Sequence, residues 1–257
     1  MRPVTLCFSG LDPSGGAGLQ ADIESVAALG GHAAVVATAL TVQDSAQVLG
    51  FEMVSPALLQ AQARCVLADL PVRAVKLGML GMADTVAAVF EVLAAHPELP
   101  VVMDPVLAAN GGGSLAREDL RQALISRFEQ TALITPNTLE ARQLAGCDDL
   151  DEALRRLQGA GARAILLKGG HEPGEIIHNR LVVNGDTVAT FPVTRLAGEF
   201  HGSGCTLAAA IAAGLAAGLS LREACAQGFR FTGEALRMAD RARDGGQWLP
   251  RRVQGGA

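Results

Sequence analysis

The chain has 257 residues, of which 49% are hydrophobic and 30 are glycine, and its formal net charge is −5. This length and apolar content suffice for one large buried core, so we expect one sizeable α/β domain rather than several small ones. The acidic balance, without any cluster of basic residues, argues against nucleic acids and anionic membranes as main partners.

No stretch of the sequence predicts a membrane anchor or a secretory signal. The longest apolar run, 207–219, is rich in alanine and shorter than the roughly 20 residues that cross a bilayer. The five cysteines form no C-x-x-C pair and no spacing suited to zinc, which favours a reducing compartment. We therefore expect a cytoplasmic protein.

Short apolar runs alternate with segments of helical periodicity, which is typical of repeated strand-helix-strand units. The predicted strands are 4–8, 33–38, 73–77, 100–103, 131–135 and 163–167, followed by a hairpin of 181–184 and 187–191 that turns at Asn184-Gly185. The predicted helices are 17–29, 56–69, 83–95, 117–127, 138–145, 149–160, 204–218 and 221–240. This order predicts an α/β fold whose central, mainly parallel sheet is covered by helices on both faces. We expect one domain over 1–243 and a loose tail over 244–257.

Two glycine-rich turns lie near opposite ends of the chain. The first, Gly10 to Gly18, follows the first strand, and the second, His201 to Thr206, leads into the nearly apolar helix 204–218. Glycine lets the backbone approach a ligand closely, and the free N–H groups of a helix N-terminus attract anions. The second turn therefore predicts a phosphate site, with a plain loop before a core helix as the alternative. Neither turn spells a P-loop or a G-x-G-x-x-G fingerprint.

Polar residues gather where the predicted parallel strands end. Gln43 follows the second strand, Lys76 ends the third, Asp104 ends the fourth, Glu140 lies after the fifth and Lys168 ends the sixth. Because ligands of α/β proteins bind at the carboxyl ends of parallel strands, this placement predicts a catalytic cleft. Only two of the 21 basic residues are lysines, which suggests that compact point charges are needed there. Two ordinary surface lysines are the alternative.

These parts suit phosphoryl transfer, which needs charge neutralisation and in-line positioning more than covalent chemistry. Asp104 and Glu140 are candidates to hold Mg²⁺, and the alternative for Glu140 is an ordinary carboxylate in the first turn of a helix. Cys205 follows the glycines at a helix N-terminus, a position that lowers the pKa of a thiol. Its role stays open between a general base and a backbone N–H donor, and a covalent adduct is the least supported role.

Seven motifs follow one another along nearly the whole chain: SGLDPSGGAGLQAD at 9–22, TALTVQD at 38–44, KLGML at 76–80, MDPV at 103–106, ITPN with Glu140 at 134–140, LKGGH at 167–171 and HGSGCT at 201–206. Together they resemble the hydroxymethylpyrimidine/phosphomethylpyrimidine kinases of thiamine biosynthesis, which belong to the ribokinase-like superfamily. The resemblance implies a ribokinase-like fold, usually dimeric, that uses ATP and Mg²⁺. Its expected reaction is phosphorylation of an aminopyrimidine alcohol and then of the monophosphate.

The resemblance also implies roles for single residues. Gln43 would hydrogen-bond the aminopyrimidine, in a pocket lined by Gly10, Asp22, Met79 and Val106. The nucleotide phosphates and the metal would face Asn137, Glu140 and Lys168. The anion hole would consist of Gly202, Gly204 and Cys205, the last of which stands where sugar kinases of the superfamily place their aspartate base.

Two departures from the family pattern concern the second phosphorylation. Residues 108–111, Ala-Ala-Asn-Gly, replace the lysine usual shortly after the Asp-Pro-Val stretch, and Glu199-Phe200 stands where a more polar pair is usual. The alternative function is that of a pyridoxal kinase, against which Gln43 favours a pyrimidine. A degenerate binding protein without activity is the second alternative, and the retained Asp104, Lys168 and glycine turn argue against it.

Overall fold

A computed structural model of the chain describes residues 1–107, 114–243 and 245–253, and only the backbone of 114–117. The helices are α1 (Gly18–Ala28), α2 (Pro56–Asp69), α3 (Ala83–Leu93), α4 (Ser114–Ile125), α5 (Thr138–Ala145), α6 (Leu150–Gly159), α7 (Ser203–Ala216) and α8 (Leu221–Arg237), with a 3-10 turn at Phe128–Gln130. The strands are β1 (Val4–Leu11), β2 (His32–Gln43), β3 (Val48–Met53), β4 (Val72–Leu77), β5 (Val101–Met103), β6 (Leu133–Ile134), β7 (Ala164–Leu167), β8 (Ile176–Val183), β9 (Asp186–Thr194), β10 (Asp240–Arg241) and β11 (Trp248–Leu249).

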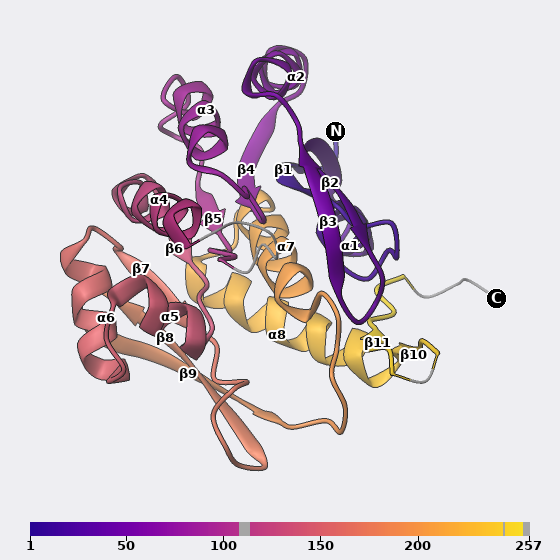
Figure 1. The fold of residues 1–257 in the computed structure, drawn as a ribbon, viewed down its shortest axis with the longest axis vertical. Helices are drawn as coiled ribbons and strands as arrows, with labels where there is room; N and C mark the ends of the chain where they lie inside the picture. Colours follow the sequence, from indigo (N-terminus) through magenta and orange to yellow (C-terminus); the bar gives the residue numbers. More distant parts are fainter. Residues whose placement is uncertain (108–113, 244, 254–257) are drawn as a thin grey trace.

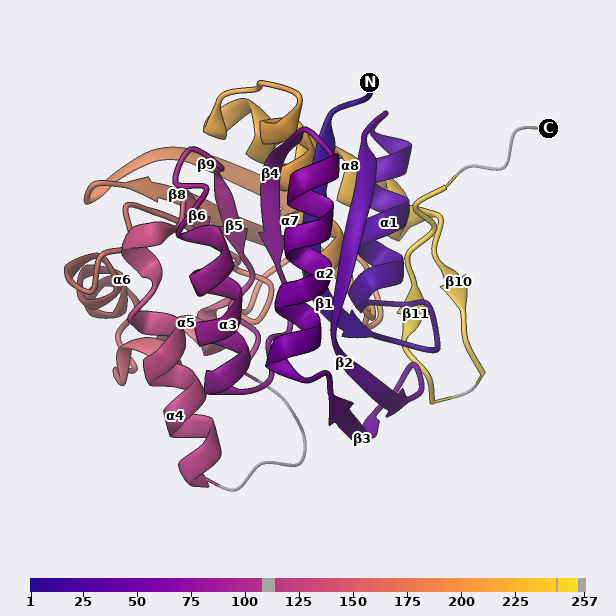
Figure 2. The same cartoon turned by 90° about the horizontal axis from the view of Figure 1, so that it is seen from above.

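One large sheet organises the described chain (Figures 1 and 2). Its strand order is β3-β2-β1-β4-β5-β6-β7-β8-β9. The six central strands, β2, β1, β4, β5, β6 and β7, pair in parallel. At the edges, β3 pairs with β2, β8 with β7 and β9 with β8 in antiparallel fashion. Helices α2 to α6 pack their apolar side chains on one face, and α1, α7 and α8 pack on the other. The predicted α/β fold with a mainly parallel, doubly covered sheet is confirmed.

The small residues of α7 let it lie at the centre of the second face. Leu207 to Gly214 are all buried, and a Cβ atom on Gly228 of α8 would come within 2.8 Å of the Ile211 side chain of α7. The two helices therefore approach each other more closely than bulkier residues would allow. This packing holds α7 rigidly against the sheet, so its N-terminus has a fixed position at the carboxyl ends of the strands.

The strand prediction differs from the structure mainly at one hairpin. The second strand was expected to end at residue 38, but β2 continues to Gln43, and its second half pairs in antiparallel fashion with β3. Gln43 is therefore the last residue of β2 rather than a residue of the following loop. The sequence of β3 contains Gly50 and Glu52 and lacks a clear alternation of apolar residues, which is why it was missed. The predicted hairpin at Asn184-Gly185 is confirmed, with positive φ angles of 51° and 100°.

The last described residues are packed and not loose, contrary to the expected tail. Strand β11 pairs with β10, and the ring of Trp248 packs on the ring of Phe200, with centroids 6.4 Å apart. The N–H of His201 donates a hydrogen bond to the carbonyl of Trp248 at 2.9 Å. Gly245 and Gly246 thus form a turn that leads into the ordered strand β11, and residues 254–257 lie outside the described residues. No helix in the described part of the chain is long and apolar enough to cross a membrane.

Candidate active site

The second glycine-rich turn forms the start of α7. Gly202 is the N-cap of this helix and has a φ of 77°, a left-handed conformation that favours glycine. A Cβ atom on Gly202 would overlap the carbonyl oxygen of Gly16, so a side chain there would force the two glycine-rich turns apart. The first N–H groups of α7 lack intrahelical acceptors and carry the positive end of the helix dipole. This arrangement can bind an anion.

Lys168, Asp104 and Gly204 meet at this helix end. Lys168 directly follows β7, and its Nζ lies 2.8 Å from Oδ1 of Asp104, which directly follows β5. Thr135, at the end of β6, donates its hydroxyl to the same oxygen at 2.9 Å. A Cβ atom on Gly204 would lie 3.2 Å from Lys168 Nζ and 3.5 Å from Asp104 Oδ2. Three neighbouring strands and α7 thus bring a cation, a carboxylate and free N–H groups to one place.

Pairing keeps both members of the Lys168–Asp104 pair charged. Burial alone would raise the pKa of the Asp104 carboxyl, but Lys168 outweighs burial and lowers this pKa. Burial alone would lower the pKa of Lys168, but Asp104 and then Glu140 outweigh it and raise that pKa. Lys168 is therefore a charged ammonium at neutral pH. Since 14% of its side chain is exposed, a ligand can reach it.

Asn137 and Glu140 cap α5 beside Lys168. The Asn137 side chain accepts a hydrogen bond from the Glu140 N–H, and Glu140 Oε2 accepts one from the Asn137 N–H, both at 2.8 Å. Glu140 Oε2 also lies 3.9 Å from Lys168 Nζ. Burial raises the pKa of the Glu140 carboxyl to about 7 in spite of the nearby Lys168. The alternative of an ordinary first-turn carboxylate therefore accounts for only one oxygen of Glu140, Oε2. The other oxygen, Oε1, accepts no hydrogen bond within the described residues.

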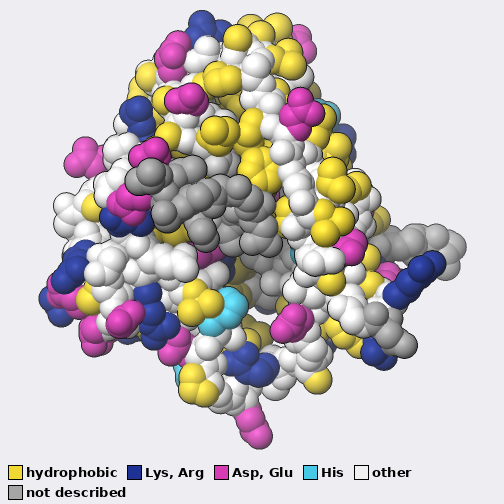
Figure 3. Space-filling model, in the orientation of Figure 1, with side chains coloured by type: hydrophobic (Ala, Val, Ile, Leu, Met, Phe, Trp, Pro, Cys, Tyr) yellow, Lys and Arg dark blue, Asp and Glu magenta, His cyan; other side chains and the backbone are white. Residues whose placement is uncertain are grey.

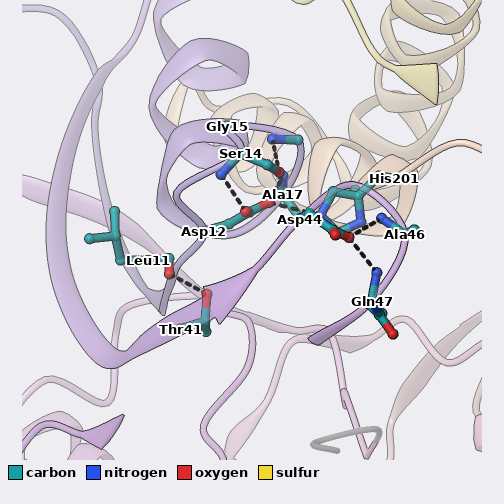
Figure 4. A network of polar contacts seen from close by, with 12 residues as sticks. Leu11, Asp12, Ser14, Gly15, Ala17, Thr41, Asp44, Ala46, Gln47 and His201 are labelled. Carbon is teal, nitrogen blue, oxygen red and sulfur yellow. Dashed lines mark hydrogen bonds and ion pairs between the residues drawn. The ribbon is translucent and has the colours of Figure 1, made fainter. Parts of the chain in front are cut away.

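Asp12 and His201 join the two glycine-rich turns (Figure 4). Asp12 Oδ1 accepts the N–H of Ser14 at 2.8 Å, and Oδ2 accepts the N–H of Ala17 at 2.8 Å and lies 2.8 Å from His201 Nε2. Burial would raise the pKa of Asp12, but the hydrogen bond to His201 and those to Ser14 and Ala17 outweigh it and lower the pKa to about 2. The carboxylate is therefore ionised and His201 Nε2 donates. The Asp-Pro-Ser-Gly sequence of an Asx turn could have indicated this role, which the sequence analysis missed.

Asp22 and Lys76 lie beneath the glycine-rich turns rather than at a pocket surface. Lys76 Nζ lies 2.8 Å from Asp22 Oδ1, and both side chains are completely buried. Ser9 completes the cluster, donating to Asp22 Oδ2 at 2.7 Å and accepting from Lys76 at 2.8 Å. The alternative that Lys76 is an ordinary surface lysine is wrong, because Lys76 is buried and neutralises the charge of Asp22. The arrangement also does not support Asp22 as a pocket-lining residue, since none of its side chain is exposed.

The expected low pKa of Cys205 is wrong. Cys205 lies in the first turn of α7, as predicted, but burial raises the pKa of its thiol, and the nearby Lys76 only partly opposes this. A helix N-terminus lowers a thiol pKa when the thiolate is solvated. Here desolvation dominates, so the thiol is protonated at neutral pH. This favours the backbone role of Cys205 over the role of a general base.

Two of the residues predicted for the aminopyrimidine, Gly10 and Met79, lie together at the end of β1. A Cβ atom on Gly10 would lie 3.4 Å from the Met79 sulfur and 3.7 Å from the Thr41 methyl group. Thr41 donates its hydroxyl to the carbonyl of Leu11 at 2.8 Å (Figure 4). Gln43 lies two residues after Thr41 and is the last residue of β2. Within the described residues the Gln43 amide makes no side-chain hydrogen bond. Val106 lies two residues after Asp104 and is partly exposed.

A cavity of about 230 Å³ opens between the Lys168 side of the cleft and α8. Its lining includes the polar residues Asn137, Lys168, His171, Asn179, Ser203 and Thr232, and the apolar residues Ile177, Val193, Leu207, Phe229 and Leu236. It shares much of its lining with a wider cavity of about 870 Å³ that reaches Arg195 and Gln247. The space-filling view shows a hollow at the centre of the same face (Figure 3). A pocket that combines a cation and polar groups with apolar side chains suits a nucleotide.

The sequence model of the phosphomethylpyrimidine kinase family matches residues 12–248. The chain belongs to this family. It is 40% identical over 249 residues to a hydroxymethylpyrimidine/phosphomethylpyrimidine kinase of Rhizobium meliloti, covering 94% of this chain and 93% of that one. It is 41% identical over 246 residues to the thiamine biosynthesis bifunctional protein ThiED of Geobacter sulfurreducens, covering 93% of this chain and 50% of that longer protein. The predicted family membership is confirmed.

Solved structures of kinases share the fold of this family member. The phosphomethylpyrimidine kinase of Clostridium difficile is 30% identical and superposes with a TM-score of 0.76, covering 91% of this chain and all of that one. A pyridoxal kinase of Bacillus subtilis, solved as an ADP complex, is 25% identical with a TM-score of 0.89 and 98% coverage of both chains. The ribokinase-like fold and the assignment as a phosphotransferase are thus confirmed.

Proposed function

We propose that the protein transfers the γ-phosphoryl group of ATP to 4-amino-5-hydroxymethyl-2-methylpyrimidine and then to its monophosphate. The observation that carries the proposal is the meeting of Lys168 Nζ, the Asp104 carboxylate and the backbone of Gly204 at the N-terminus of α7. A phosphoryl group in transfer spreads negative charge over its oxygens, and this place offers both an ammonium and free N–H groups to stabilise it. The family membership supports the pyrimidine as acceptor.

In the proposed step the substrate hydroxyl oxygen forms a bond to the γ-phosphorus, and the bond from that phosphorus to the bridging oxygen breaks. ADP leaves with the electron pair of the broken bond, and the hydroxyl proton passes to a phosphoryl oxygen or to water. Lys168 and the N–H groups of Gly204 and Cys205 would contact the phosphoryl oxygens. Because such transition states are loose, the attacking hydroxyl needs no strong base, which agrees with a protonated Cys205.

The carboxylates suit Mg²⁺ that arrives with ATP. The described residues contain no group of three or more side chains that could hold a metal alone, so the protein would supply one or two oxygen ligands. Mg²⁺ bound through phosphates, waters and one or two carboxylates has this pattern. In each of these two carboxylates one oxygen accepts no hydrogen bond from the described residues: Oδ2 of Asp104 and Oε1 of Glu140. The ion would neutralise phosphate charge as the transfer proceeds.

The nucleotide would occupy the cavity between Lys168 and α8. Its phosphates would lie beside Asn137, Lys168 and Gly204, and its base would lie among the apolar side chains of Ile177, Val193 and Phe229. Since the Asn137 side-chain oxygen already caps α5, the free amide N–H groups of this side chain are the ones that can donate to a phosphate.

The pyrimidine would lie across the cleft, beside Gly10, Met79 and Gln43. A primary amide carries one donor and one acceptor group, which match an aminopyrimidine edge that offers an amino group next to a ring nitrogen. The Gln43 amide has no other side-chain partner in the described chain, so it can supply both groups. The absence of a Cβ atom on Gly10 gives the flat ring room beside Met79.

Pyridoxal phosphorylation is a second candidate activity, favoured by the TM-score of 0.89 with the Bacillus subtilis pyridoxal kinase. The test is consumption of MgATP with hydroxymethylpyrimidine, its monophosphate and pyridoxal in parallel, with products resolved by mass. We expect mono- and diphosphate from the pyrimidine substrates. Phosphorylation of pyridoxal alone, or of none of the three, would refute the proposal. The reaction with the monophosphate tests whether the second phosphorylation proceeds without the lysine that is usual in the family. Residues 108–111, which stand in its place, lie outside the described residues.

A homodimer is the proposed assembly, and one cytoplasmic domain is the proposed organisation. Leu40, Val42 and Leu49 of the β2–β3 hairpin expose 48%, 62% and 67% of their surface, which a second copy could cover. Each of the five cysteines is free, as suits a reducing compartment. Light scattering after size exclusion should give twice the 26.5 kDa mass of the chain, and Val42→Asp should give the single mass. A monomeric wild type would refute the dimer.

A further inference from the structure

The segment from Gly245 to Val253 reaches back to both glycine-rich turns. Trp248 pairs with Phe200 just before the second turn, and a Cβ atom on Gly198 would lie 2.8 Å from its indole nitrogen. A Cβ atom on Gly16, in the first turn, would lie 2.8 Å from the side chain of Leu249. Phe200, which departs from the family pattern, is thus one of the residues against which the segment from Gly245 to Val253 packs.

Arg252 is the buried charge of this segment. The side chain is 1% exposed, and its Nη1 lies 3.1 Å from a carboxylate oxygen of Glu24, so its charge is neutralised inside the fold. The guanidinium also donates to the carbonyl oxygens of Gly15, at 3.3 Å, and Gly16, and its Nε donates to Thr206 Oγ1 at 2.8 Å. A planar fork with five donors is suited to such a set of acceptors, whereas a lysine could not reach them together.

Two of these bonds lead to the N-cap of α7. Thr206 Oγ1, which accepts from Arg252, donates to the carbonyl of Gly202 at 2.8 Å. The carbonyl of Gly16, which also accepts from Arg252, lies against Gly202 so closely that a Cβ atom there would overlap it. Arg252 therefore holds Gly202 from two sides, once through Thr206 and once through the first turn.

We propose that Arg252 is a positioning residue for phosphoryl transfer, which fixes the turn from Gly202 to Cys205 in the conformation that presents its N–H groups to the phosphoryl group. The inference rests on the proposed function. Donors that are held in place before the reaction stabilise developing charge without a cost of reorientation, so a small displacement of the turn reduces the rate more than it reduces binding. Arg252 itself touches no substrate.

The test compares Arg252→Met with Arg251→Met in the full chain. Arg251 is the matched control, because its side chain is 52% exposed and pairs only at the surface with Asp240. We expect Arg252→Met to lower kcat about 10- to 100-fold with KM for both substrates changed less than about threefold, and Arg251→Met to match the wild type. Guanidinium at millimolar concentration should restore part of the kcat of Arg252→Ala. A folded Arg252→Met with unchanged kcat, or with a raised KM alone, would overturn the proposal.

Thr206→Val provides a second test if Arg252→Met does not fold. This variant cuts the link from Arg252 to Gly202 and leaves the bonds to Glu24, Gly15 and Gly16, so we expect a smaller loss of kcat at unchanged KM. Hydrogen exchange of the peptide 199–206 needs no substrate and separates this inference from the proposed function. Exchange should be faster in Thr206→Val or Arg252→Met than in Arg251→Met. Equal exchange in these proteins would contradict the positioning role, whichever substrate the enzyme uses.

Discussion

His201 Nε2 lies 2.8 Å from Asp12 Oδ2, so a side chain of the second glycine-rich turn is bonded to the carboxylate that shapes the first. The two residues are separated by 189 positions in the sequence. The bond joins the end of β1, which borders the proposed pyrimidine pocket, to the start of α7, which borders the proposed phosphate site. In the proposed complex this bond would hold the acceptor alcohol and the phosphoryl donor at a fixed separation.

Asp12→Asn should destabilise the protein by about 1 to 3 kcal/mol at pH 7, because it removes a buried, charge-assisted acceptor. The pKa of Asp12 is lowered to about 2, so its contribution is complete above pH 4 and is lost as the pH falls toward 2. Urea unfolding of both proteins should therefore show a difference that shrinks over this range. Asp44→Asn is the control, since Asp44 is exposed and accepts backbone N–H groups that asparagine can also bind. A pH-independent difference would contradict the assignment.

Lys168→Ala should lower kcat about 100- to 1,000-fold while the protein stays folded, because it removes the ammonium that stabilises the transferred group. The comparison is Lys76→Met, which removes the other lysine and leaves the buried Asp22 without its partner. That variant should lose about 3 to 5 kcal/mol of stability, since an unpaired charge stays buried. Steady-state kinetics and thermal unfolding of both variants distinguish the two roles. Full activity of folded Lys168→Ala would exclude Lys168 from the transfer step.

Glu140 should make the KM for MgATP depend on pH. Burial raises the pKa of its carboxyl to about 7, and only the ionised form binds Mg²⁺, so KM should fall as the pH rises from 6 to 8. Glu140→Gln should show a weaker dependence that reflects ATP itself. Between pH 4.5 and 7 the folded state holds this proton more tightly than the unfolded state, so Glu140 contributes less stability as pH rises. The unfolding free energy of Glu140→Gln relative to wild type should therefore increase over that window.

Cys205→Ala should retain kcat within about tenfold, because alanine keeps the backbone N–H and the native thiol is protonated at neutral pH. A general base would contribute about 100- to 10,000-fold. The measurement is kcat from pH 6 to 9, in which the variant should keep the profile of the wild type. A loss of several hundredfold together with a changed profile would restore the base role.

Much of the fold could be predicted because its signals are local. Apolar runs, helical periodicity and the Asn184-Gly185 turn indicated the order of the elements. The rule that ligands bind at the carboxyl ends of parallel strands predicted that Asp104 and Lys168 share one site. What could not be predicted depends on neighbours distant in sequence. Arg252 meets Gly16 across 236 positions, and no feature near Arg252 distinguishes it from Arg251.

Burial also determines the roles of Cys205, Lys76 and Lys168, which residue type alone did not settle. The helix position of Cys205 predicts a low thiol pKa, whereas its desolvation raises that pKa. Lys76 and Lys168 both end or follow strands with similar sequences, yet Lys76 is fully buried against Asp22 and Lys168 reaches the cleft. The direction of each lysine depends on packing around the strand and not on the strand itself.

The most direct test of the whole account is the ratio of kcat/KM for hydroxymethylpyrimidine to that for pyridoxal, measured in the wild type and in Gln43→Ala. If Gln43 reads the aminopyrimidine edge, the wild type should prefer the pyrimidine, and the ratio should fall about tenfold or more in the variant with the KM for ATP unchanged. An unchanged ratio would show that Gln43 does not select the substrate. A wild-type preference for pyridoxal would contradict the central claim.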